Sequence, residues 1–263
     1  MASGHPRYLD ARQTVRCVDS TCRISHLAMG QVVEMCVTET RILIQARMSS
    51  SRLPGKTLAV LAGQPLIDHV IGRVCEVVEP AQVVLATSNH VSDDILVEHV
   101  SRRHGIEVFR GALENLVRRY QDCVRRFPCE WFVRICADSP FIDPDLIALM
   151  LRAVGDGDHL VSNVVERSFP PGQSVEVIRT EVFQALSSDL LDSYEREHVT
   201  SHFYRHPDRY RIRSVTAGGA SFGGRRLVVD TADDLRAAEL MIRESPDLLR
   251  GYAAQAVVAA RRS

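Results

Sequence analysis

The chain has 263 residues, of which 45% are apolar, and its formal net charge is −1. This size allows one sizeable core with at most a small subdomain. The balanced charge argues against a nucleic-acid partner or an anionic membrane surface, and no apolar run approaches the roughly 18 residues of a membrane span.

The first 34 residues are unlike the rest of the chain, and we treat residues 1–38 as an extension. They are rich in Arg, Cys, Ser and His, lack steady periodicity, and contain no apolar core long enough for a secretory signal. We expect either a disordered extension or a start codon assigned too early, with Met29 or Met35 as the true start. We therefore place the working domain at residues 39–263.

The seven cysteines of the chain form no C-x-x-C pair, which favours free thiols in the cytoplasm.

The next segment is the most informative one. Residues 42–44 read Ile-Leu-Ile and predict a buried strand, after which a Ser/Gly loop carries Arg47, Arg52 and Lys56. Loop N–H groups and fixed cations of this kind hold a triphosphate and neutralise charge during transfer. The spacing of a Walker loop is absent. The alternative is a basic surface loop that turns at Pro54 and Gly55.

Strand-like and helix-like patterns then alternate. Apolar spacing predicts helices at residues 66–78, 93–104 and 114–126 and strands at residues 83–87, 107–109 and 131–135, and Asp143 with Pro144 predicts the start of a further helix. Such alternation predicts a Rossmann-like three-layer α/β/α domain with a mainly parallel sheet. Ligands of these sheets gather beyond the carboxyl ends of the strands.

The pattern changes after Asp158. Residues 159–163, 174–178 and 210–216 read as strands around a helix near residues 193–206. We expect a small, partly antiparallel extension over residues 159–216 that covers the acceptor site or pairs with a second subunit. A buried strand at residues 227–229 and a helix capped by Thr231 and Asp234 follow.

Two aspartates end predicted strands. Asp138 follows the strand at residues 131–135, and Asp230 follows residues 227–229. Taken singly, each is better explained as a cap or turn residue. As a pair at one sheet edge they suit Mg²⁺, which binds one or two carboxylates together with substrate phosphates.

Several motifs resemble one family. I-Q-A-R-M-S-S-S-R-L-P-G-K at residues 44–56, V-R-I-C-A-D-S-P-F-I-D-P at residues 133–144 and V-V-D-T-A-D-D-L at residues 228–235 are similar to the cytidylyltransferases related to CMP-KDO and CMP-sialic acid synthetases, in particular the SpsF branch of spore coat polysaccharide biosynthesis. The resemblance runs from about Arg41 to Arg243. It implies CTP as donor, Asp138 and Asp230 as magnesium ligands, a homodimer, and a set of nucleotide-binding residues: Gln45, Ala46, Arg47, Ser49, Arg52, Lys56 and Arg119.

The resemblance also implies an acceptor site. S-N-x-x-x-R at residues 162–167, V-E-V at residues 175–177 and E-H-V-T at residues 197–200 match motifs of the family. They assign acceptor binding to Asn163, Arg167, Glu176 and His198. A lone histidine on a helix is more often structural, and Ser174 stands where many relatives carry Asp. The identity of the acceptor is therefore left open.

Together with these residues, the resemblance implies Mg²⁺-dependent transfer of CMP from CTP to an anionic acceptor, such as a sugar acid, sugar phosphate or phosphonate, with Arg47 and Lys56 as catalytic cations. One alternative is a glycosyltransferase that uses a nucleotide-sugar. Its D-x-D motif is offered by Asp156 and Asp158, but these lie in a polar loop and not at the end of an apolar strand. The other alternative is a nucleotide-binding protein that has lost catalysis, against which the joint presence of Arg47, Lys56, Asp138 and Asp230 argues.

Overall fold

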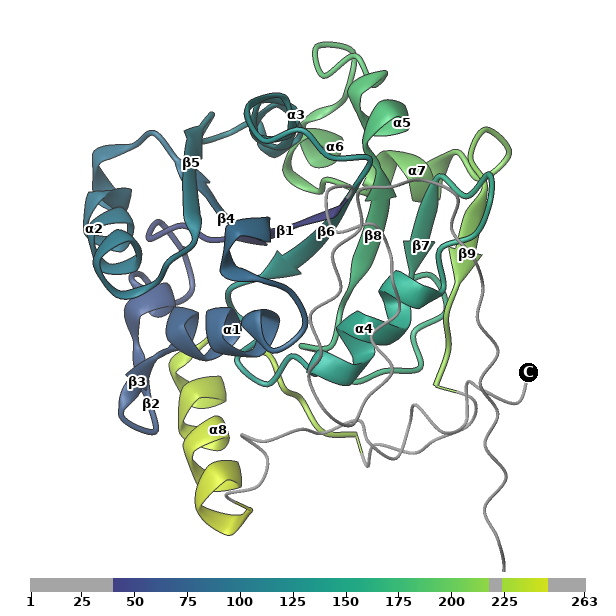
Figure 1. Ribbon diagram of the computed structural model, residues 1–263. Coiled ribbons are helices and arrows are strands. Elements are labelled where there is room, and N and C mark those ends of the chain that lie inside the picture. Colours follow the sequence, from purple (N-terminus) through teal and green to yellow (C-terminus); the bar gives the residue numbers. More distant parts are fainter. Residues whose placement is uncertain (1–39, 218–223, 246–263) are drawn as a thin grey trace, which may run out of the picture. The chain divides into compact units, whose positions relative to one another are not determined.

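The computed structural model describes residues 40–217 and 224–245, so the prediction for residues 1–38 lies outside the described residues. A seven-stranded sheet with the order β5-β4-β1-β6-β8-β7-β9 forms its centre (Figure 1). The strands β1 (Thr40–Gln45), β4 (Val83–Ser88), β5 (Glu107–Gly111) and β6 (Trp131–Cys136) are all parallel. The predicted α/β fold with a mainly parallel sheet is confirmed.

Side chains of the central strands alternate between two cores. In β1, Ile42 and Ile44 belong to one core, whereas Leu43 belongs to the other. A strand that is buried on both faces reads as a continuous apolar run, which is why residues 42–44 contain no polar residue.

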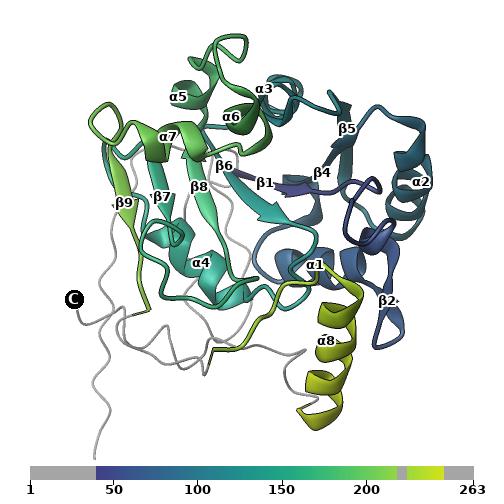
Figure 2. The ribbon, with the colours of Figure 1, turned by 180° about the vertical axis from the view of Figure 1, so that it is seen from behind.

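Helices cover both faces. Apolar side chains of α1 (Leu66–Cys75), α2 (Asp94–Arg103) and α4 (Pro144–Arg152) join the core of Ile42 and Ile44. Those of α3 (Leu116–Arg126) and α5 (Thr180–Gln184) join the core of Leu43. Figure 2 shows α1 and α4 on the side of the sheet opposite to α3 and α5. The side chain of Asp143 caps α4, as the sequence predicts.

The extension continues the same sheet. The strand β8 (Glu176–Arg179) pairs antiparallel with β6 and with β7 (Leu160–Ser162), and β9 (Ile212–Ser214) pairs parallel with β7. The prediction of a partly antiparallel extension is therefore confirmed.

The single helix predicted near residues 193–206 is wrong. Two short helices occupy this region, α6 (Ser193–Glu197) and α7 (Ser201–Arg205). Between them His198 adopts an extended backbone with φ −109° and ψ 91°. This break turns Val199 into the core, where it is 1% exposed, and brings Thr200 to Glu176.

The strand predicted at residues 227–229 is also wrong. Leu227 N donates to Pro171 O at 2.8 Å, and Val229 N donates to Asp138 O at 2.8 Å. The extended segment thus bonds to two separate stretches of chain and forms no ladder, although Leu227 and Val229 are buried as the composition suggests. The Thr231–Asp234 capping box opens α8 (Ala232–Glu244) as predicted.

Short elements complete the described chain. They are the hairpin of β2 (Val60–Leu61) and β3 (Gln64–Pro65) and the 3₁₀ turns η1 (Lys56–Leu58), η2 (Pro80–Gln82) and η3 (Val91–Asp93). Among the helices of residues 40–217 and 224–245, none has the length and apolar character required to cross a membrane.

Candidate active site

The loop after β1 is folded back on itself. Gly55 adopts φ 75°, a left-handed conformation that glycine reaches without strain, and its N–H donates to Met48 O at 2.9 Å. Thr57 Oγ1 donates to Arg47 O at 3.0 Å, which fixes the loop a second time. Lys56 leaves this turn with its side chain directed inward, and 13% of that side chain is exposed.

Asp93, which lies in a different segment of the chain, holds the loop through its carboxylate. Its Oδ1 accepts from Met48 N at 2.8 Å, and its Oδ2 accepts from Thr87 Oγ1 at 2.9 Å and Ser88 N at 3.0 Å. Burial alone would raise the pKa of Asp93, but these hydrogen bonds outweigh it and hold the pKa below its ordinary value. Asp93 therefore ties the loop to the end of β4 as a carboxylate.

Lys56 joins the two predicted metal ligands. Its Nζ donates to Asp138 Oδ2 at 2.9 Å, Asp230 Oδ1 at 2.8 Å and Val229 O at 3.2 Å. Burial would lower the pKa of Lys56, but the two carboxylates outweigh it and raise the pKa above its ordinary value. We call this group of Lys56, Asp138 and Asp230 the Lys56 centre.

Two arginines contact Asp230 of the Lys56 centre. Arg52 Nη2 lies 3.0 Å from Asp230 Oδ1, and Arg226 Nη2 donates to Asp230 Oδ2 at 3.0 Å. The two carboxylates converge on one cation, and Mg²⁺ usually takes one or two protein carboxylates while phosphate oxygens and water complete its shell. The donor set therefore fits a magnesium ion, with Asp138 and Asp230 as the residues that would hold it.

The other predicted nucleotide-binding residues lie at different depths. Arg47 Nη2 donates to Glu197 Oε1 at 2.7 Å in an exposed ion pair, and Ser49 is exposed on the loop. Ala46 is buried at the end of β1. Gln45 Oε1 accepts from Arg134 Nε at 3.2 Å. Arg47, Ser49 and Arg52 are thus open to a ligand, whereas Gln45 is engaged with the neighbouring strand.

Arg119 lies beneath the loop between β5 and α3. Its guanidinium donates to Ala112 O at 2.8 Å and to Leu113 O at 2.9 Å, and the residue is 1% exposed. A Cβ at Gly111 would come within 2.8 Å of Arg119 Cγ, so this approach requires glycine. The structure directs Arg119 to the backbone of its own loop and does not join it to the Lys56 centre.

A cavity of about 870 Å³ adjoins Asp138. Three of the four predicted acceptor residues, Arg167, Glu176 and His198, line it. Arg167 is exposed, and the ring of His198 packs against Tyr194 with centroids 4.2 Å apart. Both side chains can contact a ligand in the cavity.

Glu176 is fully engaged inside the protein. Its Oε2 accepts from Arg134 Nη1 at 2.6 Å, and its Oε1 accepts from Thr200 Oγ1 at 2.7 Å and from the Tyr204 hydroxyl. The side chain is 2% exposed. The geometry favours a residue that shapes the cavity wall over one that offers a free carboxylate.

The fourth residue, Asn163, is placed away from the cavity lining. It is 3% exposed, its Nδ2 donates to Gln173 O at 2.6 Å, and its Oδ1 accepts from Val175 N at 2.9 Å. Asn163 thus satisfies two backbone groups of the segment that precedes β8. Its direct role in acceptor binding stays a prediction that this geometry does not favour.

Comparison with known proteins identifies the family. A model of the family described as cytidylyltransferase matches residues 41–243. The chain belongs to the cytidylyltransferase family. The protein is 31% identical to the spore coat polysaccharide biosynthesis protein SpsF of Bacillus subtilis (strain 168) over 215 residues, which cover 78% of this chain and 88% of that protein. It is 36% identical to the 3-deoxy-manno-octulosonate cytidylyltransferase of Marinobacter nauticus over 111 residues, 40% of either chain.

Solved structures share the fold of this cytidylyltransferase. A cytidylyltransferase from Leptospira borgpetersenii serovar Hardjo-bovis superposes with a TM-score of 0.70 at 24% identity, covering 81% of this chain and 98% of that one. A CMP:2-keto-3-deoxy-manno-octonic acid synthetase complexed with CTP gives a TM-score of 0.59 at 19% identity, covering 78% and 99%. These likenesses bear on the fold alone, and they agree with the predicted nucleotidyltransferase architecture.

Sequence reasoning did not foresee the roles of two residues that build this site of the cytidylyltransferase. Asp93 was read only as the start of a helix, since its contact with Met48 spans 45 residues. Gly172 adopts φ 97°, and a Cβ there would come within 2.4 Å of Leu227 C. Gly172 thus lets the segment that ends at Asp230 pass close by. A glycine within P-P-G is a turn signal, but its neighbour in space could not be read from the sequence.

The D-x-D pair of the glycosyltransferase alternative lies in a turn. Asp158 Oδ2 accepts from Gly155 N at 2.9 Å and from Arg213 Nε at 2.6 Å. This carboxylate is neutralised by an arginine and closes its own turn. The arrangement gives no support to a metal site for a nucleotide-sugar.

Proposed function

We propose that this cytidylyltransferase transfers CMP from CTP to an anionic acceptor in the synthesis of a surface polysaccharide or related glycan, with Mg²⁺ as cofactor. The observation that carries the proposal is the Lys56 centre, which stands between a cationic loop and a cavity that shares Asp138. The names of the relatives support CTP as donor and a sugar-acid class of acceptor.

The loop after β1 would bind the triphosphate of CTP. Arg47, Arg52 and Lys56 supply positive charge, and ionised donors of this kind form strong hydrogen bonds to phosphate oxygens. Arg47 can leave Glu197 because both partners of that ion pair are largely exposed. The loop therefore binds, positions and neutralises the phosphates.

The reaction is a displacement at phosphorus. An acceptor oxygen forms a bond to the α-phosphorus, the bond from that phosphorus to the bridging α,β-oxygen breaks, and pyrophosphate leaves with that oxygen. Positioning and charge neutralisation supply most of the rate enhancement in such transfers. When bound at Asp138 and Asp230, Mg²⁺ would add further neutralisation of the phosphate charge.

The cavity beside Asp138 would bind the acceptor. Arg167 and His198 offer positive charge or hydrogen-bond donors to an acid group, and Ser139 and Ser174 add hydroxyl groups to the wall. An acceptor phosphate or phosphonate attacks in its ionised form. An acceptor hydroxyl must lose a proton, and Asp138 is the carboxylate of the Lys56 centre that lines the cavity.

Pyrophosphate release tests the proposal. The purified protein is assayed with Mg²⁺, CTP and a panel of sugar acids, sugar phosphates and phosphonates, alongside Asp138→Ala. Asp156→Asn, an exposed change in the turn before Asp158, is the matched control. Release that requires one acceptor, is abolished in Asp138→Ala and is retained in Asp156→Asn supports the proposal.

Other outcomes discriminate the alternatives. Consumption of a nucleotide-sugar without pyrophosphate release would favour a glycosyltransferase. Binding of CTP without turnover by any acceptor would favour a protein that has lost catalysis, and failure to bind CTP would overturn the proposal. We also propose a homodimer, as the resemblance implies. Light scattering on the protein as it elutes from a size-exclusion column tests it separately by measuring the molar mass.

A further inference from the structure

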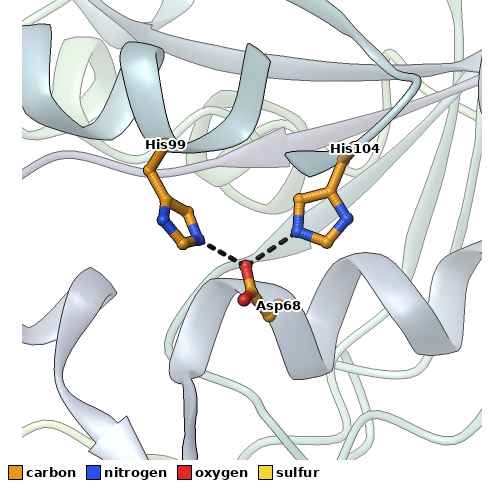
Figure 3. A group of neighbouring side chains, drawn as sticks. All are labelled: Asp68, His99 and His104. Atoms are coloured by element: carbon orange, nitrogen blue, oxygen red, sulfur yellow. Dashed lines mark hydrogen bonds and ion pairs between the residues drawn. The ribbon is translucent and has the colours of Figure 1, made fainter. Parts of the chain in front are cut away.

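Three side chains outside the active site converge on one point. Asp68 of α1, His99 of α2 and His104, which follows α2, turn their polar atoms toward one another (Figure 3). His99 Nε2 and His104 Nε2 each lie 2.7 Å from Asp68 Oδ1. The three potential ligand atoms all lie within 4.8 Å of one another.

The fold holds each of the three in place. Asp68 stands in the first turn of α1, and its side chain is 2% exposed. His104 caps the end of α2, with its N–H bonded to Val100 O at 2.9 Å, and His99 lies on the last turns of the same helix. Burial alone would raise the pKa of Asp68, but the hydrogen bonds from His104 and His99 outweigh it and lower the pKa. The carboxylate is therefore ionised at neutral pH.

We propose that Asp68, His99 and His104 form a binding site for a divalent transition-metal ion, with Zn²⁺ as the favoured ion. Two imidazole nitrogens and one carboxylate oxygen make a common zinc donor set, and a water molecule can complete the shell. Each ring would bind the ion through Nε2 as a neutral imidazole with its proton on Nδ1, in place of the Nε2 proton that donates to Asp68 when no ion is bound.

The two rings converge on one carboxylate oxygen, so the three atoms that form hydrogen bonds here would surround an ion after a small outward movement of the side chains. Both rings approach the same oxygen, Oδ1, whereas Oδ2 of that carboxylate faces Arg103 Nε at 2.9 Å. The Arg103 side chain is 57% exposed and can turn into solvent. His99 and Arg103 also border a surface hollow of about 500 Å³, which gives an ion and its water ligand a path of entry.

A second histidine cluster is a less suitable site. Glu195, His202 and His206 also come within ligand distance of one another. However, Glu195 Oε2 already accepts from Asp192 N at 3.2 Å in the capping box of α6, so this carboxylate closes the start of a helix. This second cluster therefore serves as an internal control.

The proposed ion would connect α1 to α2, and α2 begins beside Asp93, which holds the loop after β1. Asp68 and the two histidines link α1 to the end of α2, and the start of α2 carries Asp93, which bonds to Met48 of the loop. A bound ion would stabilise this framework without contacting the Lys56 centre. The expected role is structural, and it does not depend on the function proposed above.

Cobalt binding gives a direct test on the full chain. The metal-free protein is titrated with Co²⁺ in excess Mg²⁺, which occupies hard oxygen sites, while visible absorption is recorded. We expect one equivalent of Co²⁺ with ligand-field bands and no thiolate charge-transfer band, and displacement by Zn²⁺. His99→Ala and His104→Ala should each lower the affinity at least about 100-fold, since even outer-shell changes lower it 10- to 100-fold. His206→Ala should leave the affinity unchanged.

Thermal unfolding supplies a second readout. Zn²⁺ should raise the Tm of the wild type and should not raise that of Asp68→Asn, which keeps a carbonyl oxygen for an imidazole but loses the charge. The proposal is overturned if the wild type binds no Co²⁺, if thiolate bands dominate, or if His206→Ala and His99→Ala weaken binding equally. An equal loss of Tm in Asp68→Asn with and without Zn²⁺ would also overturn it and would leave a hydrogen-bonded tether between α1 and α2.

Discussion

The Lys56 centre and the network around Glu176 both pair cations with carboxylates, yet they are built differently. Arg134 and Glu176 face each other on β6 and β8, and the Glu176 side chain is 2% exposed. Lys56 extends from a loop, and the Asp138 side chain beside it is 25% exposed. The sheet fixes the first pair by register and encloses it, whereas the second pair is held by a loop and remains partly open to a charged ligand. One region is scaffold, and the other is suited to binding and transfer.

The largest expected effect concerns Lys56. Lys56→Met removes the cation between Asp138 and Asp230 and should lower kcat/KM for CTP about 1,000-fold, since loss of one donor that stabilises transition-state charge lowers rates 10²- to 10³-fold. Pyrophosphate release under the conditions found for the wild type measures it. A Lys56→Met enzyme within tenfold of the wild type would contradict the assignment of Lys56 to the phosphates.

Glu176 should affect stability first. Glu176→Ala leaves the guanidinium of Arg134, whose side chain is 17% exposed, without its carboxylate and should lower the free energy of unfolding by about 3 kcal/mol, the lower end of the range for broken buried pairs. Urea denaturation measures this loss. Glu197→Ala, which breaks the exposed pair with Arg47, is the matched control. Equal stability of Glu176→Ala and the wild type would show that Glu176 is not scaffold.

Asp93 should give a smaller, pH-dependent effect. Asp93→Asn should lower the free energy of unfolding by about 1–3 kcal/mol near pH 7, because buried donors lose their charged acceptor. The folded-state pKa of Asp93 lies below its ordinary value of 3.8, so its contribution is present above that pH and is lost as the pH falls through the folded pKa. The stability difference between variant and wild type should therefore shrink in acid, and a difference that does not change with pH would contradict this account.

The smallest stability effect is expected at Arg47. Arg47→Ala should change the free energy of unfolding by less than about 1 kcal/mol, since its ion pair with Glu197 is exposed. The same variant should raise KM for CTP, whereas Glu197→Gln, which breaks the same pair, should not. An equal rise of KM in both variants would mean that the pair itself, rather than the free guanidinium, binds the nucleotide.

Local patterns were sufficient for most of the fold. The apolar run at residues 42–44, the apolar spacing of α1 and the caps at Asp143 and Thr231 all depend on neighbours within a few residues, and the structure contains each of them. The errors arose where distant chain decides. Residues 227–229 have the composition of a strand, but their backbone groups bond to Pro171 and Asp138. Whether a buried apolar segment joins a ladder depends on which backbone lies beside it.

By itself the sequence determined the α/β alternation, the cationic loop and the resemblance to a cytidylyltransferase, because period, turn chemistry and motif are all local properties of the chain. Only the tertiary structure placed Lys56 against Asp138 and Asp230, which are 82 and 174 residues away. It also gave both carboxylate oxygens of Glu176 hydrogen-bond partners and brought Asp68 to His99 and His104. Such contacts follow from strand order and helix packing, which bring together residues that no spacing in the sequence relates.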